Sequence, residues 1–171
     1  MVNKFIKTST NLTKFSNKKY KGKRILFFLI FILTFSNNVF SQDIKFSSSY
    51  FPNSPGLKEA KKNIRMGNSL FIKGEGYYNE ALDYYLKANL FNPDNAELNY
   101  KIGVCYLYTA DKDKAVEHLE KAYRLKSDVT EDITYYLGMA YHQNFDFDQA
   151  INFYRKYLDV LNPRNKDKYL N

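Results

Sequence analysis

The chain has 171 residues, with 26 Lys and Arg side chains against 18 Asp and Glu, which gives a formal charge of +8. The whole excess lies in residues 1–41, which contain eight basic residues and no acidic one. Residues 42–171 are therefore neutral overall, which argues against a nucleic-acid-binding domain, since such a domain gathers cations on its folded surface. A single cysteine, Cys105, excludes an internal disulfide and a cysteine-rich zinc site.

Residues 1–41 have the composition of a secretory signal peptide. A basic run from Lys18 to Arg24 precedes the apolar stretch ILFFLIFILTF at 25–35, and small residues follow it. A membrane-spanning helix needs about 20 apolar residues, so this stretch is too short to be an obvious anchor. Cleavage after Ser41 would make Gln42 the mature N-terminus, and the alternative is an uncleaved segment that provides the chain's membrane contact. We therefore expect an exported protein.

The repeating part of the chain follows a predicted linker. Residues 42–56 contain SSSYFPNSPG, whose composition favours a linker over a helix or strand. Residues 57–163 contain one pattern three times, as NEALDYYLKANLFNP (79–93), DKAVEHLEKAYRLKS (113–127) and DQAINFYRKYLDVLNP (148–163). Ala81, Ala115 and Ala150 coincide at spacings of 34 and 35 residues, and such a period indicates a helical-repeat fold.

A glycine-containing helix is predicted before each of these segments. The helices lie in IRMGNSLFIKG (64–74), NYKIGVCYLYT (99–109) and TYYLGMAYHQN (134–144), with Gly67, Gly103 and Gly138 at matching positions. A glycine inside a helix costs about 1 kcal/mol relative to alanine, so its use here suggests that two helices approach closely. We expect each glycine to face the alanine of its partner helix.

The pattern predicts six helices and their starting residues. They lie near 58–73, 77–91, 94–109, 111–126, 129–143 and 146–161. Asn92-Pro93-Asp94 is typical of a helix N-terminus, with Asn92 as the cap, and Asp111, Asp128 and Asp146 are similar candidates.

These features together resemble the tetratricopeptide repeat. The signature is a small residue after an aliphatic one, a tyrosine three positions later and then the alanine-containing helix, with Pro93 and Pro163 at the family's closing proline. The resemblance implies an all-α fold, a right-handed α-solenoid of three helical hairpins at about 60–93, 94–128 and 129–163, with a tail at 164–171. It also implies binding of a protein partner, either a peptide segment or another subunit.

A second resemblance concerns the order of the parts. A signal peptide, a linker with YFPNS and repeats containing NYKIGVCYL and TYYLGMAYH are similar to the N-terminal region of certain large envelope proteins. Those proteins carry a further domain similar to outer-membrane protein A, which binds peptidoglycan, and some serve type IX secretion or gliding. This resemblance implies a location in the periplasm or at the outer membrane, in a truncated relative or a short stand-alone paralogue.

The sequence contains no recognisable catalytic or metal-binding motif. HxxxH, CxxC and GxSxG patterns are absent, and the two histidines, His118 and His142, are best explained as solvated or helix-packing side chains. We therefore expect no enzyme activity, no cofactor and no small-molecule substrate.

Two surfaces are candidates for binding a partner. The first is the concave side lined by the first helix of each hairpin, where stacked repeats commonly bind. Its candidate residues are Ile64, Asn68, Phe71, Tyr100, Val104, Tyr108, Tyr135, Met139 and His142. The second is the wide apolar stripe of the last helix, which includes Tyr154, Tyr157, Leu158 and Leu161. The first surface predicts a scaffold that grips a partner, and the second predicts a structural subunit docked through its last helix.

Overall fold

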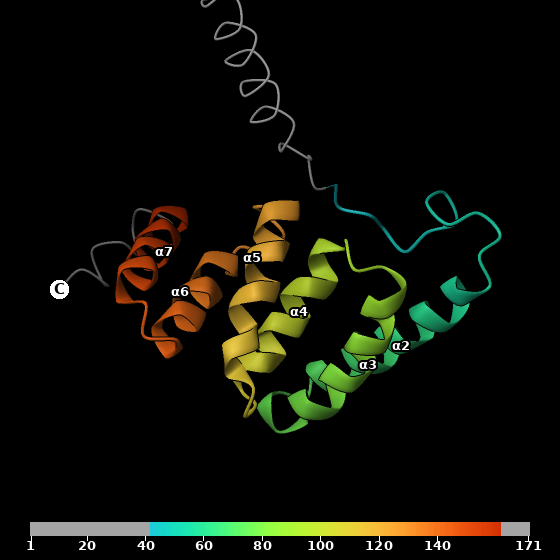
Figure 1. The fold of residues 1–171 in the computed structure, drawn as a ribbon, viewed down its shortest axis with the longest axis horizontal. Coiled ribbons are helices and arrows are strands. Elements are labelled where there is room, and N and C mark those ends of the chain that lie inside the picture. Colours follow the sequence, from blue (N-terminus) through green and yellow to red (C-terminus); the bar gives the residue numbers. More distant parts are fainter. Residues whose placement is uncertain (1–41, 162–171) are drawn as a thin grey trace, which may run out of the picture. The chain divides into compact units, whose positions relative to one another are not determined.

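The computed structural model describes residues 42–161, and every regular element in that part is helical (Figure 1). The elements are α2 (Gly56–Phe71), η1 (Glu75–Tyr77), α3 (Tyr78–Phe91), α4 (Ala96–Leu107), η2 (Lys112–Lys114), α5 (Ala115–Leu125), α6 (Ile133–Gln143) and α7 (Phe147–Val160). The prediction of an all-helical fold is confirmed for these residues. The expected signal peptide at 1–41 and the tail at 164–171 lie outside them.

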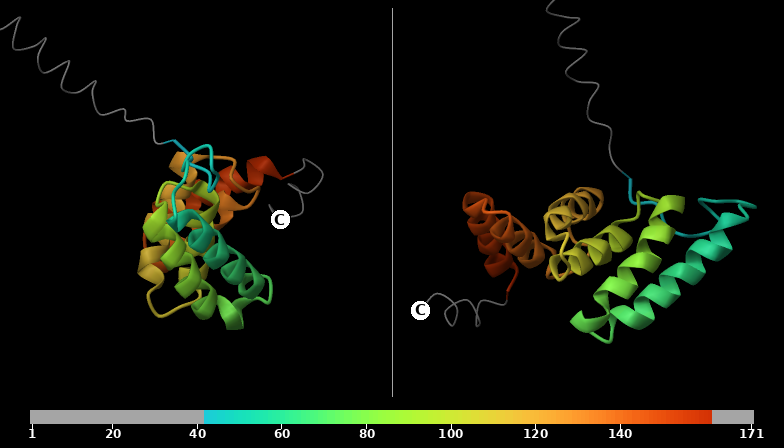
Figure 2. Two further views of the ribbon diagram at one scale, coloured as in Figure 1. Left: turned by 90° about the vertical axis from the view of Figure 1, so that its right-hand side faces the viewer. Right: turned by 60° about the horizontal axis from the view of Figure 1, so that its bottom comes forward.

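The helices pack in chain order. α2 packs mainly against α3, α4 against α5 and α6 against α7, and smaller contacts between α3 and α4 and between α5 and α6 join one pair to the next (Figure 2). Each helix therefore has its principal contacts with its sequence neighbours, which is the arrangement of an α-solenoid. α6 begins at Ile133, later than the predicted start near residue 129.

Each helix pair is held by a glycine that faces a large side chain. A Cβ atom added to Gly67 would lie 2.5 Å from the Tyr85 ring, and one added to Gly138 would lie 2.5 Å from the Tyr154 ring. At Gly103 the added Cβ would lie 2.5 Å from Leu119 Cγ. The atoms nearest each glycine thus belong to the residue four positions after the alanine, and not to the alanine itself as expected.

The alanines have a different role in the packing. Ala81, Ala115 and Ala150 are all buried, each near the start of the second helix of a pair. Tyr106 and Tyr141 pack beside these helices, where Tyr141 stacks on Phe153 with ring centroids 5.5 Å apart.

The predicted helix starts are partly correct. Asp146 caps α7 by accepting a hydrogen bond from the backbone N–H of Gln149. The cap of α4 is Asn95, whose side chain accepts from the N–H of Leu98, and the predicted cap Asn92 lies three residues too early. Asn92 is instead buried in the turn before α4.

A buried polar contact joins α4 to α5. Asn99 donates its amide hydrogens to the carbonyl oxygens of Pro93 and Asn95, so its Oδ1 accepts from Nδ1 of His118 at 3.0 Å. Burial lowers the pKa of His118. Among the smaller effects, the charge of Glu117 raises this pKa and that of Lys121 lowers it, so the ring is mainly neutral at pH 7. This histidine packs between helices, as the sequence suggested.

We predict that Gly103→Ala destabilises the protein by about 1–3 kcal/mol, because the new methyl group would overlap Leu119 in a closely packed interior. Leu119 cannot easily move, since its own backbone nitrogen lies 3.1 Å from the added Cβ. Urea unfolding followed by circular dichroism measures the change. The control is Gly76→Ala, where a Cβ would meet nothing within 4 Å. Equal stability of Gly103→Ala and wild type would contradict this packing.

Candidate protein-binding surface

A row of aromatic side chains from α2, α3, α6, α7 and the C-terminal cap of α4 is the main feature of the candidate surface. We call it the aromatic row, and it consists of Phe71, Tyr78, Tyr108, Tyr136, Tyr135, Tyr154 and Tyr157. The ring centroids are 5.0 Å apart for Phe71 and Tyr78, and 5.3 Å apart for Tyr78 and Tyr108. Tyr135 contacts Tyr136 at 5.4 Å, Tyr154 at 6.1 Å and Tyr157 at 5.3 Å.

The ring contacts divide the aromatic row into two parts, one that ends at Tyr108 and one that contains Tyr135 and Tyr136. These two parts lie close enough to influence each other's pKa values. Burial, followed by the charge of Asp132 and then by Tyr108, raises the pKa of Tyr136 to about 12. Burial first, and Tyr135 among its neighbours, also raises the pKa of Tyr108. These phenols are therefore neutral at physiological pH, and each can offer a ring face together with a hydroxyl that donates or accepts a hydrogen bond.

Exposure identifies the members of the aromatic row that a partner can reach. Tyr108 is 37% exposed and Tyr135 is 39% exposed, whereas Phe71, Tyr78 and Tyr136 are only partly exposed. Large side chains of this kind supply much of the binding energy at protein interfaces.

Three residues predicted for the concave surface have side chains that are buried or already bonded within the protein. Val104 is completely buried between helices, and Tyr100 is only 7% exposed because its ring packs on Tyr136 and its hydroxyl donates to Asp132 at 2.9 Å. The side-chain oxygen of Asn68 already accepts from Tyr85 Oη at 2.8 Å and from Lys101 Nζ at 2.9 Å. Val104 and Tyr100 therefore support the surface from beneath, although Tyr100 also lines a pocket beside α7, and Asn68 is half-buried.

The remaining predicted residues are distributed over several places. Phe71, Tyr108 and Tyr135 belong to the aromatic row, and Met139 is half-buried against the core. Ile64 lines a pocket between α2 and α4. His142 is exposed at the end of α6 and contacts the ring of Phe147 edge-on, at 5.7 Å.

The two surfaces predicted separately meet at α7. Tyr154, Tyr157, Leu158 and Leu161 line one pocket of about 360 Å³, together with Tyr135 of the concave side. A neighbouring pocket of about 670 Å³ combines apolar side chains with two acidic ones, and it is lined by Tyr100, Thr130, Glu131, Asp132, Tyr157, Val160 and Leu161.

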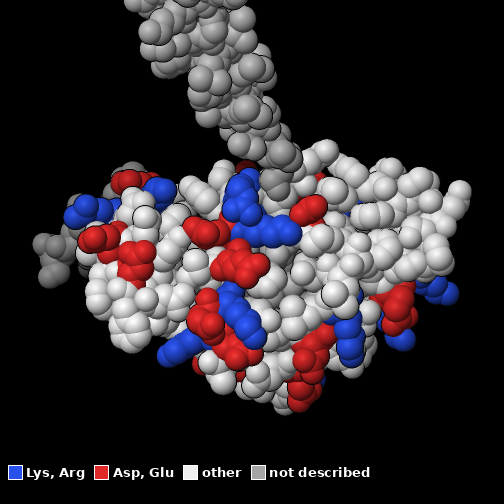
Figure 3. All heavy atoms as spheres, in the orientation of Figure 1, with Lys and Arg blue, Asp and Glu red and all other residues white. Residues whose placement is uncertain are grey.

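A third pocket, between α2 and α4, has the opposite charge. We call it the basic pocket, with a volume of about 320 Å³ and a lining of Lys45, Phe46, Lys61, Ile64, Arg65, Asn95, Glu97, Leu98 and Lys101. Its basic residues outnumber its single acidic one, Glu97. On the face shown in Figure 3, by contrast, acidic and basic side chains are interspersed.

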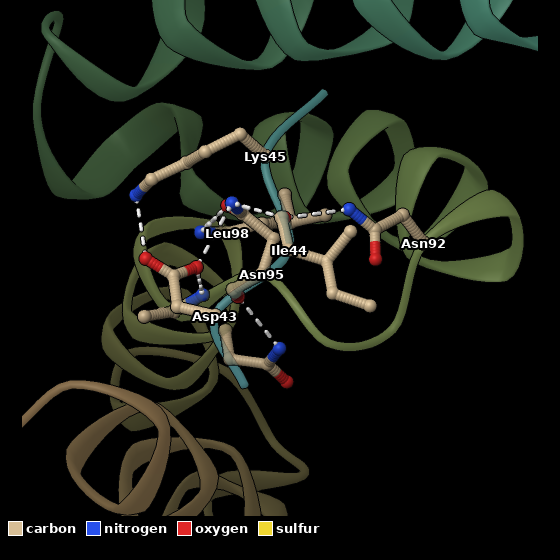
Figure 4. Close-up of polar contacts among 8 residues, drawn as sticks. Asp43, Ile44, Lys45, Asn92, Asn95 and Leu98 are labelled. Atoms are coloured by element: carbon tan, nitrogen blue, oxygen red, sulfur yellow. Dashed lines mark hydrogen bonds and ion pairs between the residues drawn. The ribbon is translucent and has the colours of Figure 1, made fainter. Parts of the chain in front are cut away.

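The residues that precede α2 are docked on the repeats. Asp43 Oδ1 accepts from the backbone N–H of Ala96 at 2.9 Å, at the N-terminus of α4. Ile44 donates its N–H to the carbonyl of Asp94 at 2.7 Å and accepts from the side-chain amides of Asn92 and Asn95 (Figure 4). The segment predicted as a linker therefore contains no regular element before α2 begins at Gly56, but side-chain and backbone contacts fix it to the repeats.

Among residues 42–161, no group of three or more His, Cys, Asp and Glu side chains is arranged to hold a metal ion. None of the helices described there is long and apolar enough to cross a bilayer.

Sequence reasoning missed Tyr78 and Tyr136 as members of the aromatic row. Tyr78 starts the second helix of its pair, whereas the prediction considered first helices alone. Tyr136 directly follows Tyr135, so the helical period placed it on a different face from its neighbour. The docked segment at 43–46 carried no motif that would indicate a binding contact.

Helix pairs that pack in chain order, with a glycine at the same position in each pair, define a helical-repeat protein. Residues 96–129 and 135–160, which span α4 with α5 and most of α6 with α7, match the sequence model of the tetratricopeptide repeat. These two segments thus match the tetratricopeptide repeat, as the sequence pattern indicated, and repeats of this kind commonly provide surfaces for protein–protein interaction.

Similar curated proteins include three BBSome complex members named BBS4. The one from Bos taurus is 32% identical over 104 residues, the one from Mus musculus 31% over 104 residues, and the one from Xenopus tropicalis 32% over 103 residues. In each case the match covers 60% of this chain and 19% of the relative. The chain thus spans about a fifth of the length of the curated relatives it matches.

We predict that Asp43→Ala destabilises the protein by about 1–2 kcal/mol, the usual cost of removing an acceptor from a helix N-terminus. Asp43→Asn should cost less because its side-chain oxygen can still accept from Ala96. Urea unfolding measures both variants. Asp128→Ala is the control, since Asp128 is exposed and has no ion pair or side-chain hydrogen bond within 42–161. A value for Asp43→Ala equal to that of the control would show that the docked segment adds no stability.

Proposed function

We propose that this chain is an exported, non-catalytic scaffold that holds a protein partner in the cell envelope. The partner is a peptide segment or another envelope subunit, and it contacts the aromatic row. The aromatic row carries this proposal, because its rings come from four helices and the residue that follows α4, and include two tyrosines that are more than a third exposed. Neutral phenols of this kind suit a peptide, which offers apolar side chains and backbone hydrogen-bonding groups.

We include α2 and α3 in the repeat array. The contact of Gly67 with Tyr85 resembles those of Gly103 with Leu119 and of Gly138 with Tyr154. This similarity supports a third tetratricopeptide hairpin at the start of a right-handed solenoid.

The proposal of export depends on the composition of residues 1–41. Their basic run, apolar stretch and small residues are typical of a signal peptide, with Gln42 as the new N-terminus. The resemblance of the following repeats to those of envelope proteins supports a place in the periplasm or at the outer membrane, in a secretion or gliding-type assembly.

A second candidate function is that of a structural subunit docked through α7. It is favoured by the exposure of large apolar side chains at this helix, where Phe147 is 53%, Ile151 48% and Val160 59% exposed. In this alternative the chain corresponds to the N-terminal part of a larger peptidoglycan-associated protein, and α7 packs against another part of the assembly.

Export is tested by producing the full chain with a C-terminal tag in a Gram-negative host and separating periplasm, membranes and cytosol. We expect the tagged protein in the periplasmic fraction, with a mass that corresponds to a start at Gln42. Full-length protein in the cytosol would refute export and leave the binding surface untouched.

Binding is tested by capturing partners from an envelope extract with wild type and with Tyr108→Ala plus Tyr135→Ala. Removal of two interface tyrosines should weaken capture by about tenfold or more, since each such anchor contributes about 1–2 kcal/mol. Tyr50→Ala is the control, because Tyr50 is 43% exposed and lies outside the aromatic row. Undiminished capture by the double variant, together with loss in Ile151→Lys plus Val160→Lys on the exposed part of α7, would replace the scaffold with the subunit docked through α7.

A further inference from the structure

We propose that the basic pocket binds side-chain carboxylates of an extended acidic peptide, while an apolar side chain of the same peptide fills the pocket floor. This inference depends on the proposed function, since it names the chemistry of the partner. It goes beyond that function by assigning a site that lies outside the aromatic row.

The floor of the basic pocket is apolar. Leu98 is 3% exposed, and Phe46 and Ile64 are partly buried against the core. The pocket volume of about 320 Å³ is sufficient for a large aliphatic or aromatic side chain. Burying such a side chain on this floor would supply the hydrophobic part of the binding energy.

The rim of the pocket presents two cations that have no partner in the described part of the chain. Lys61 and Arg65 lie one turn apart on α2, and both are exposed. Neither makes an ion pair or a side-chain hydrogen bond within residues 42–161. Two unpaired cations at this spacing can contact one carboxylate together, or two carboxylates of an extended chain.

The other two cations are already held in place. Lys101 Nζ donates to Glu97 at 2.7 Å and to Asn68 Oδ1 at 2.9 Å, and its side chain is only 18% exposed. Lys45 pairs with Asp43 at 2.5 Å. The charge of Glu97 is thus neutralised by Lys101, so the free charge of the pocket comes from Lys61 and Arg65.

The combination of floor and rim selects the partner. An exposed ion pair contributes little by itself, so a small anion gains too little from Lys61 and Arg65 alone. A peptide in extended conformation places alternate side chains on opposite sides, so that carboxylates can reach the rim while apolar groups enter the floor. An acidic apolar peptide therefore fits better than a phosphate group or a nucleic acid backbone.

The pocket between α4 and α7 restricts where the acidic part of the partner can lie. This pocket is lined by the acidic residues Glu131 and Asp132. The adjacent α4 residues Tyr100 and Lys101 line different pockets, since Tyr100 lines this one and Lys101 lines the basic pocket. Acidic side chains of a partner would be attracted to the basic pocket on the α2 side of α4 and repelled by the pocket on the α7 side. The partner therefore binds with its acidic part at α2.

The test uses the full chain and a fluorescent peptide in which aspartate alternates with leucine, with an amidated C-terminus. The comparison peptide has asparagine in place of aspartate. By fluorescence anisotropy at low salt, we expect the aspartate peptide to bind about tenfold more tightly, with the difference reduced at high salt. Lys61→Glu plus Arg65→Glu should remove this preference. Arg124→Glu plus Lys126→Glu on and beside α5 changes the net charge equally and should retain it.

Four outcomes would overturn the inference. They are equal affinity for the two peptides, an unchanged preference in Lys61→Glu plus Arg65→Glu, loss of the preference in the α5 control, and displacement of the peptide by an equal concentration of inorganic phosphate. In each of these cases the scaffold function still stands if Tyr108→Ala plus Tyr135→Ala loses its partner. The scaffold function fails only if that capture is undiminished.

Discussion

The structure depends on close approach within each helix pair, where the backbone of one helix leaves room for a large side chain of the other. Gly67, Gly103 and Gly138 each lie where a Cβ would come within 2.5 Å of a facing side chain. Real Cβ atoms essentially never make such contacts, so glycine is the residue that fits without rearrangement. The side chains of Tyr85, Leu119 and Tyr154 then occupy equivalent positions in successive pairs, although Tyr154 is only partly buried.

This packing also creates the binding surface. Close packing of successive helices brings Tyr108, at the end of α4, next to Tyr78 on α3, and Tyr135 on α6 next to Tyr157 on α7. Tyr135 shows the effect most clearly, since it contacts rings from its own helix and from α7. The surface is therefore a product of the repeat and not of any single helix.

Periodicity predicted the helices well because helical repeats are stabilised by contacts between sequence neighbours. It predicted the site less well, because exposure depends on how each pair sits against the next. Val104 and Tyr135 illustrate this, since both lie on first helices, yet one is completely buried and the other is 39% exposed. The docking of Asp43 could not be predicted, because its acceptor contact with Ala96 joins residues that are 53 apart in sequence.

That long-range contact has a consequence for how the molecule unfolds. In an array of purely local contacts, terminal repeats fray independently of the rest. Here, bonds from Asp43 and Ile44 to Asn92, Asn95 and Ala96 close a loop that contains α2 and α3, so both ends of the first pair are tied to the start of α4. At the other end α7 has no comparable closure among the described residues. Cooperativity is thus unequal along the stack, and hydrogen exchange should begin in α6 and α7.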